Sequence, residues 1–158
     1  MDLEKRIKDA IDRGHQRPTA EKGSEGPTPE QLKNRHNEYR LEMSSYIESV
    51  LAQIVDQLPG FNQETLFGEK GWGAAIHRDD LVLNKATRRN DYSRLEIFVR
   101  PMNEYFVVDL ASKATVRNRE IWNRSVFKPV MEADMDAMKE QVNLWAVQYV
   151  EAYVAESR

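Results

Sequence analysis

His77 and Asp79 are the residues in this sequence best placed for acid–base chemistry. The chain contains three histidines, His15, His36 and His77, and none stands in a His-x-x-x-His or His-Glu-x-x-His pattern that would indicate a zinc site. If residues around His77 are extended, alternation directs His77 and Asp79 to one side, where a carboxylate could orient an imidazole for general base catalysis. A solvated turn with a charge pair explains the same residues more simply.

A second group of candidates consists of arginines that could bind anions. The net charge of the chain is −3, but residues 78–128 contain 11 Lys/Arg against 7 Asp/Glu, and residues 129–158 contain 2 against 6. Aromatic residues are interleaved with the arginines, as in surfaces that hold phosphates and stack bases. Acidic neighbours dilute this basic region, so a solvated sheet face or a surface for a protein partner stays open. The candidates for anion or nucleic-acid binding are Arg100, Arg117, Arg119 and Arg124, with Arg117 and Arg119 expected on the same face of one strand.

The C-terminal segment carries two apolar stripes at helical spacing. The first contains Met131, Met135, Met138, Val142, Trp145, Tyr149 and Tyr153. It is typical of a helix packed on a core, or of the lining of a small-ligand pocket. The second stripe, on nearly the opposite side, contains Leu144, Val147, Val150 and Val154. A helix with two apolar faces needs a packing partner on each face. The second stripe is therefore the candidate interface of a homodimer.

Several classes of function lack their residues here. The chain has no cysteine, which excludes disulfides, thiolate metal sites and cysteine nucleophiles. The glycines near Trp72 lack the spacing of a phosphate-binding loop, and no Gly-x-Ser-x-Gly motif is present. We therefore expect no metal and no cofactor. We also expect no membrane span and a cytoplasmic location, since no apolar run has the length of a signal or a span.

Two long helices are expected to frame the fold. Thr28, Pro29 and Gln31 form a capping box with proline at the first helical position, which predicts a helix from residue 28 to residue 58. The second long helix follows Phe127-Lys128-Pro129. A short helix over residues 2–13, with Leu3, Ile7 and Ile11 at spacing four, precedes a flexible linker. We therefore divide the chain into this appendage, residues 1–28, and one domain, residues 29–158.

Between the long helices the apolar period changes from about 3.6 to 2. Residues 61–73 are expected to be a connection in which Phe61, Leu66, Phe67 and Trp72 are buried. Residues 74–77 and 81–83 are expected to be two short strands, or one strand interrupted at 78–80. Further strands are expected at residues 95–100, 105–110 and 115–122, with turns at 101–104 and 111–114. These short connections predict antiparallel neighbours. The predicted fold is α+β: a β-meander of about four strands packed by two long helices, in the order α-α-β-β-β-β-α.

Three functional hypotheses remain open at this level. The first is a non-catalytic protein-interaction module, an adaptor or chaperone-like homodimer. The second is a binder of anions or nucleic acid through an arginine-rich sheet face. The third is an enzyme or small-ligand pocket between helix and sheet. The missing catalytic motifs and the surplus apolar surface favour the first.

Overall fold

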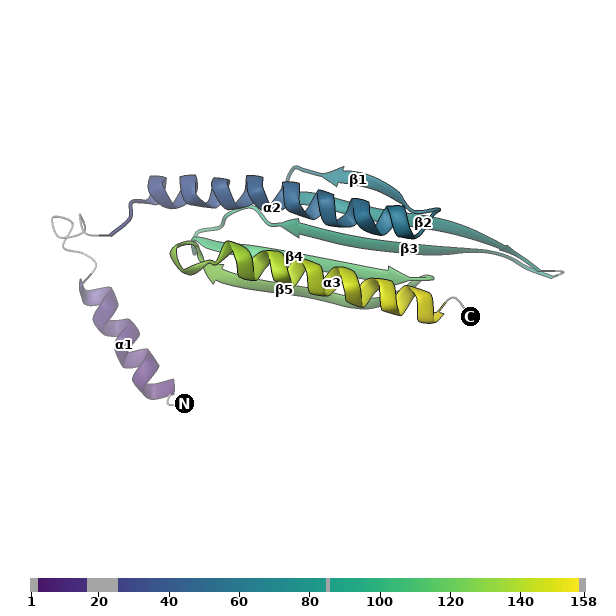
Figure 1. Cartoon of the computed structure of the whole chain (residues 1–158). Helices are drawn as coiled ribbons and strands as arrows, with labels where there is room; N and C mark the ends of the chain where they lie inside the picture. The colour runs from purple at the N-terminus through teal and green to yellow at the C-terminus, as the bar shows by residue number, and fades with distance from the viewer. Residues whose placement is uncertain (1–2, 17–25, 85, 157–158) are drawn as a thin grey trace.

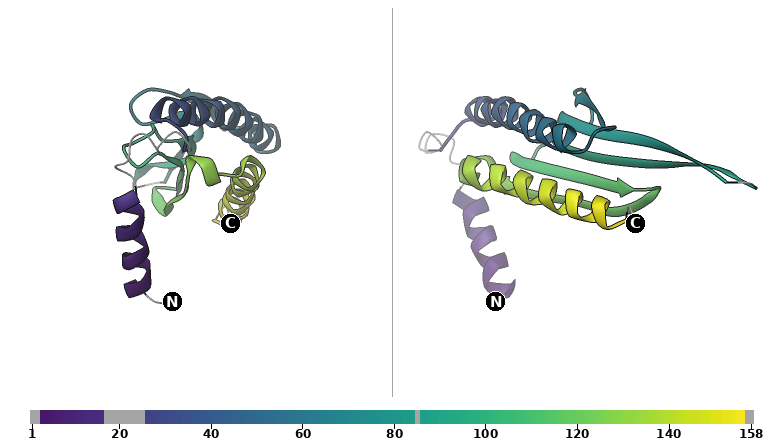
Figure 2. Two further views of the ribbon diagram at one scale, coloured as in Figure 1. Left: turned by 90° about the vertical axis from the view of Figure 1, so that its left-hand side faces the viewer. Right: turned by 45° about the vertical axis from the view of Figure 1, so that its right-hand side comes forward.

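Two long helices lie side by side on one face of an antiparallel sheet (Figures 1 and 2). The computed structural model describes residues 3–16, 26–84 and 86–156. Its elements are α1 (Leu3–Gln16), α2 (Pro29–Gln57), β1 (Asn62–Leu66), β2 (Trp72–Leu83), β3 (Arg88–Val99), β4 (Val107–Val116), β5 (Arg119–Pro129), the short 3-10 helix η2 (Val130–Glu132) and α3 (Met135–Glu156). The strands follow the order β1-β2-β3-β4-β5. The predicted α+β class is confirmed, with five strands in place of about four.

Helix α2 begins at the predicted capping box. The Thr28 hydroxyl accepts a hydrogen bond from the Gln31 backbone N–H at 3.1 Å, and the Gln31 side chain accepts one from the Thr28 N–H at 2.9 Å. The side of α2 that faces the sheet buries Met43, Ile47 and Leu51 completely. This helix and α3 run in the same direction, because the five strands between them make an odd number of passes (Figure 1).

His36 is buried under α2, with 2% of its surface exposed. Burial lowers the pKa of His36, and the charge of Arg40 lowers it further, against a hydrogen bond to the backbone of Arg100. Its Nε2 has no hydrogen-bond partner among the residues that the structure describes. The imidazole is therefore held neutral in the folded state, and protonation opposes folding.

The segment after α2 is more ordered than expected. Residues Asn62–Leu66 form strand β1, which pairs with Gly73–His77 of β2. Phe61 is buried as predicted, but Phe67 is 79% exposed, so its prediction as a buried anchor is wrong. The sequence of β1 is mostly polar and its side chains are mostly exposed. An edge strand of this kind has no apolar alternation by which it could be predicted.

The hairpin of β4 and β5 differs from the predicted boundaries. Residues 111–114 were expected to turn, yet they lie inside β4, and both alanines there are buried. The turn is formed by Arg117 and Asn118, whose φ angles are +46° and +71°. Small side chains at 111 and 114 are required by close packing on the sheet and do not indicate a turn. The prediction that Arg117 and Arg119 share a strand face is wrong, because the turn separates the two strands.

The core lies between the sheet and the two long helices. The first stripe of α3 enters it from Met138 onward, with Val142, Trp145 and Tyr149 at most 2% exposed. Met131, predicted as its first member, lies in η2 and is 60% exposed, so that part of the prediction is wrong. The Tyr149 hydroxyl donates to the carbonyl of Thr115 at 2.9 Å. Burial raises the pKa of Tyr149, so this donor stays protonated. No helix among the described residues is both long and apolar enough to cross a membrane.

Strands β2 and β3 extend beyond their neighbours as a two-stranded arm. Strand β1 pairs with β2 only as far as His77, and β4 pairs with β3 only from Arg94 onward. The arm therefore comprises residues 78–83 and 88–93, and it projects from one end of the sheet (Figure 1).

Candidate protein-interaction surface

The second stripe of α3 lies on the outer side of the helical layer. Leu144 is 47% exposed, Val147 58% and Val154 49%, and Val150 is half-buried. Because α3 turns its aromatic stripe toward the sheet, these four residues, which alternate with that stripe along the sequence, point to the opposite side of the helix. We call them the α3 stripe. Their positions agree with the prediction that this side of α3 is apolar.

An apolar groove continues the α3 stripe toward α2. It has a volume of about 410 Å³. Ile54 and Ala146, each 6% exposed, are its most buried residues, and Val147 and Val150 belong to both the groove and the stripe. The complete lining is Gln53, Ile54, Gln57, Asn143, Ala146, Val147, Val150 and Glu151. We call this hollow the α2–α3 groove.

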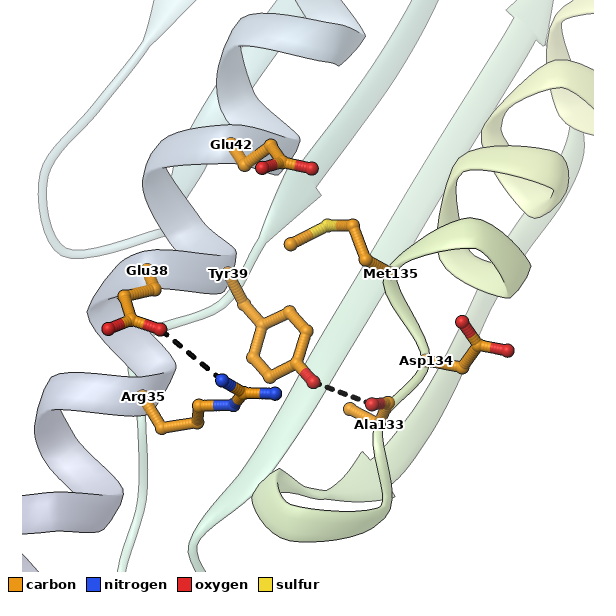
Figure 3. Close-up of a pocket in the computed structure, with 7 residues that line it drawn as sticks. All are labelled: Arg35, Glu38, Tyr39, Glu42, Ala133, Asp134 and Met135. Carbon is orange, nitrogen blue, oxygen red and sulfur yellow. Dashed lines mark hydrogen bonds and ion pairs between the residues drawn. The ribbon is translucent and has the colours of Figure 1, made fainter.

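The opposite end of the helix pair is polar. A hollow of about 410 Å³ there is lined by Arg35, Glu38, Tyr39, Glu42, Ala133, Asp134 and Met135 (Figure 3). The Tyr39 hydroxyl donates to the carbonyl of Ala133 at 2.6 Å, and Arg35 lies 3.5 Å from the Glu38 carboxylate. The Tyr39 bond joins α2 to the segment before α3, and the Arg35–Glu38 pair lies within α2.

A third hollow lies between α3 and the edge of the sheet at β5. Its volume is about 440 Å³, and Val108, Val126, Phe127 and Met138 supply most of its apolar lining. Of the stripe proposed for a small-ligand pocket, Trp145 and Tyr149 are packed in the core. The third hollow is therefore the place where a ligand between helix and sheet would lie.

His77 and Asp79 lie at the base of the arm. The His77 ring centre is 6.3 Å from that of Tyr92, and an Asp79 oxygen accepts from the Asn90 amide at 2.7 Å. Both residues belong to β2, on the side of the sheet away from the helices. Each of these contacts is with β3, so the two side chains are held by cross-strand neighbours of the hairpin.

The four candidate arginines are divided between the two sides of the sheet. Arg100 lies over the Phe98 ring at 5.9 Å on the side away from the helices, which we call the open face. The other three contact α3. Arg117 donates to the Tyr153 carbonyl at 3.3 Å, Arg119 is paired with Glu156, and Arg124 reaches the Gln148 side chain at 3.5 Å. The structure does not bring the four side chains together.

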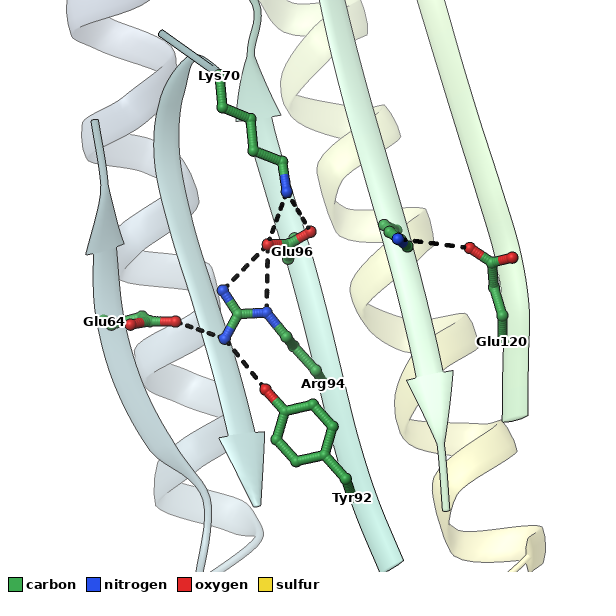
Figure 4. Close-up of polar contacts among 7 residues, drawn as sticks. Glu64, Lys70, Tyr92, Arg94, Glu96 and Glu120 are labelled. Carbon is green, nitrogen blue, oxygen red and sulfur yellow. Dashed lines mark hydrogen bonds and ion pairs between the residues drawn. The ribbon is translucent and has the colours of Figure 1, made fainter. Parts of the chain in front are cut away.

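The open face has a charge network that the sequence did not single out (Figure 4). The Glu96 carboxylate lies 3.0 Å from both Lys70 Nζ and Arg94 Nη2, with its side chain only 7% exposed. Arg94 also pairs with Glu64 and contacts the Tyr92 hydroxyl. These charges neutralise one another, and the network links β1 and the β1–β2 connection to β3.

The pKa values of the Glu96–Arg94 pair are shifted apart. Burial alone would raise the pKa of Glu96, but hydrogen bonds from Lys70 and Arg94 outweigh it, and the net shift is downward. Burial alone would lower the pKa of Arg94, yet its bonds to Glu64, Tyr92 and Glu96 raise it. Both groups are therefore charged at neutral pH. The signal in the sequence was the Arg94–Glu96 spacing of two, which places both on one strand face.

The wall of the groove that α2 contributes was also missed. Gln53, Ile54 and Gln57 were not predicted to line a binding surface. These residues line the groove only because α2 and α3 lie side by side, and the sequence of one helix alone does not predict that arrangement. Among the described residues, no group of three histidine, aspartate or glutamate side chains could hold a metal ion.

No family model, no curated protein and no solved structure matches this chain.

Proposed function

We propose that this protein is a non-catalytic protein-interaction module that binds through the helical layer and forms a homodimer. The observation that carries the proposal is the α3 stripe, which is exposed and continuous with the apolar α2–α3 groove. In a two-fold dimer each stripe packs against its own copy. A cytoplasmic location is part of the proposal and fits a chain without cysteine.

The size of the stripe sets the strength expected of the dimer. Burying the exposed half of a valine or leucine side chain contributes about 1 kcal/mol, so eight such side chains contribute about 8 kcal/mol. Association itself costs about 4–15 kcal/mol. At the lower limit of this cost the surplus is about 4 kcal/mol, so we expect a weak, concentration-dependent dimer with a dissociation constant of about 1 mM.

The partners of the arginines support this proposal over anion binding. Three of the four candidates are turned to α3 and the fourth lies on the open face, so one ligand has no common surface to contact. The α2–α3 groove, by contrast, is one continuous site. Its lining is mostly aliphatic or neutral and polar, which suits a protein surface.

The test is the oligomeric state of Val147→Glu. Sedimentation velocity over a range of concentrations should show a dimer for the wild type, and at least tenfold weaker association for the variant, since a buried unpaired carboxylate is costly. Leu41→Glu is the matched control, because Leu41 is 61% exposed on α2 and does not line the groove. A wild-type chain that stays monomeric at about 1 mM, or equal weakening by both substitutions, would contradict the proposal.

A further inference from the structure

Helix α1 has an exposed apolar stripe. Leu3 is 67% exposed, and Ile7 and Ile11 are each 51% exposed. Every described side chain from residue 3 to residue 13 is exposed, and the helix stands apart from the domain (Figure 1). A helix of 14 residues is marginal in water by itself, so it gains stability by placing such a stripe on an apolar surface.

We infer that α1 docks in the α2–α3 groove of its own chain and covers Val147 and Val150. This inference rests on the proposed function, because α1 would then occupy the surface that a second copy needs. Helix α1 thereby regulates association: the groove is closed when α1 is docked and open to a partner when it is not.

The length of chain between α1 and α2 permits this contact. Twelve residues, 17–28, separate the two helices and can span about 40 Å. The groove begins at Gln53, 24 residues along α2, which is about 36 Å from its start. If α1 lies antiparallel to α2 with Ile7 over the groove, the last residue of α1 is about 14 Å nearer to the start of α2. The remaining distance of about 22 Å, with a helix diameter of about 10 Å to cross, is within reach.

The charges around the groove favour a segment with basic flanks. Residues 48–58 of the α2 region and 143–156 of α3 contain four acidic residues and no lysine or arginine. Of these, Glu48 is bonded to Thr65, Glu156 is paired with Arg119, and Glu151 lines the groove. Helix α1 contains four basic residues against three acidic ones, a net charge of +1. The other hollows of the helical layer have two to four charged lining residues each, whereas the groove has one, Glu151. The groove is therefore the hollow that best suits the apolar stripe of α1.

A docked helix of this kind is released easily. A short tether holds the two surfaces at an effective concentration in the millimolar range. If three aliphatic contacts give a dissociation constant of about 1 mM, each copy is open about half of the time. Two copies must both be open to form the dimer, so α1 weakens the apparent affinity about fourfold.

The experiment uses paired cysteines in the full chain, which has none of its own. Under mild oxidation, A10C/Q53C should form an intramolecular disulfide at least ten times faster than A10C/L41C. Leu41 is nearer than Gln53 to the end of the tether, so unspecific contact favours the control pair. Adding Ile7→Asp to A10C/Q53C should slow the reaction at least fivefold. Equal rates for the two pairs, no effect of Ile7→Asp, or a product that is mainly a disulfide-linked dimer would overturn docking within the chain.

The dimer assay separates this inference from the proposed function. With the natural sequence elsewhere, Ile7→Asp should tighten the dimer about fourfold. If the wild type and Ile7→Asp are both monomeric while the A10C/Q53C disulfide forms fast, the proposed dimer fails and α1 docking stands. If Val147→Glu abolishes the dimer while the two cysteine pairs react equally, the dimer stands and α1 docking fails.

Discussion

Replacing Glu96 by glutamine tests whether the open-face network stabilises the fold. The carboxylate is nearly buried, and its two oxygens receive hydrogen bonds from Lys70 at 3.0 and 3.1 Å and from Arg94 at 3.0 and 3.2 Å. Glutamine keeps the shape of the side chain but removes its charge, and its amide N–H₂ group meets the two cations. Arg94 keeps Glu64 and Tyr92 as partners.

The expected loss of unfolding free energy in Glu96→Gln depends on how exposed each partner of Glu96 is. Breaking a fully buried ion pair costs about 3–5 kcal/mol. The Lys70 side chain is 57% exposed, so its part of the network contributes less than about 1 kcal/mol. Arg94 is 22% exposed and keeps a second carboxylate, which reduces the loss further. We expect Glu96→Gln to lower the free energy of unfolding by about 2 kcal/mol, which is about 4–8 °C in Tm.

The stabilising effect of Glu96 is expected to depend on pH. The pKa of Glu96 in the folded state lies below its ordinary value of 4.5, so the unfolded chain takes up the proton first. The stabilisation by Glu96 is therefore complete above pH 4.5 and is lost as the pH falls through the folded-state pKa. The difference between wild type and Glu96→Gln should be constant from neutral pH to about pH 5.5 and should shrink below pH 4.5.

Urea unfolding followed by tryptophan fluorescence measures both quantities. Glu120→Gln is the control, since Glu120 and Lys113 are 4.0 Å apart and each 51% exposed; it should cost less than about 0.5 kcal/mol. Glu96→Gln with an effect no larger than that of Glu120→Gln, or with an undiminished effect in acid, would refute the reasoning.

Two further predictions concern stability. Because burial lowers the pKa of His36, the free energy of unfolding should fall as the pH drops below 6.5, and His36→Gln should remove that slope while the His77→Gln control retains it in the same urea titrations. Gly73→Ala should cost more than about 3 kcal/mol in thermal or urea unfolding, because its Cβ would overlap the carbonyl oxygen of Ile97, whereas Gly68→Ala, with open space but a φ of +114°, should cost about 1–2 kcal/mol; similar losses at both glycines would contradict this.

The sequence predicts the helices better than the strands, for physical reasons. The capping box at Thr28 is a local signal for the start of α2, and it is confirmed. Strand β1 is absent from the prediction because its side chains are mostly exposed and polar. The β4–β5 turn was misplaced because small buried residues at 111 and 114 resemble turn residues. The positive φ of Asn118, a residue that tolerates this conformation, marks the true turn.

The candidate interaction surface was also predicted only in part. The α3 stripe is a property of one helix, so the spacing of Leu144, Val147 and Val154 predicts that they share one side. The α2–α3 groove depends on two helices separated by more than 70 residues, and no spacing within either one encodes it. The arginines were grouped by their closeness in sequence, yet the β4–β5 turn and the contacts with α3 separate them. Sequence periodicity thus predicts a surface that lies on one helix or strand, but it does not predict a surface formed by two elements that are distant in the sequence.

The two sides of the sheet differ in how many of their charged groups are already paired, and this difference is the reason for proposing that association occurs on the helical side. On the open face, an anion that binds Arg94 must compete with Glu64 and Glu96, which hold it already. A partner at the α2–α3 groove covers aliphatic side chains without breaking an ion pair, whether it displaces water or the docked α1, and every apolar atom that it covers adds to affinity. The helical layer is therefore the side where binding gains free energy without first breaking an ion pair. This also explains why substitutions at Val147 should change association, while those at Glu96 should change stability.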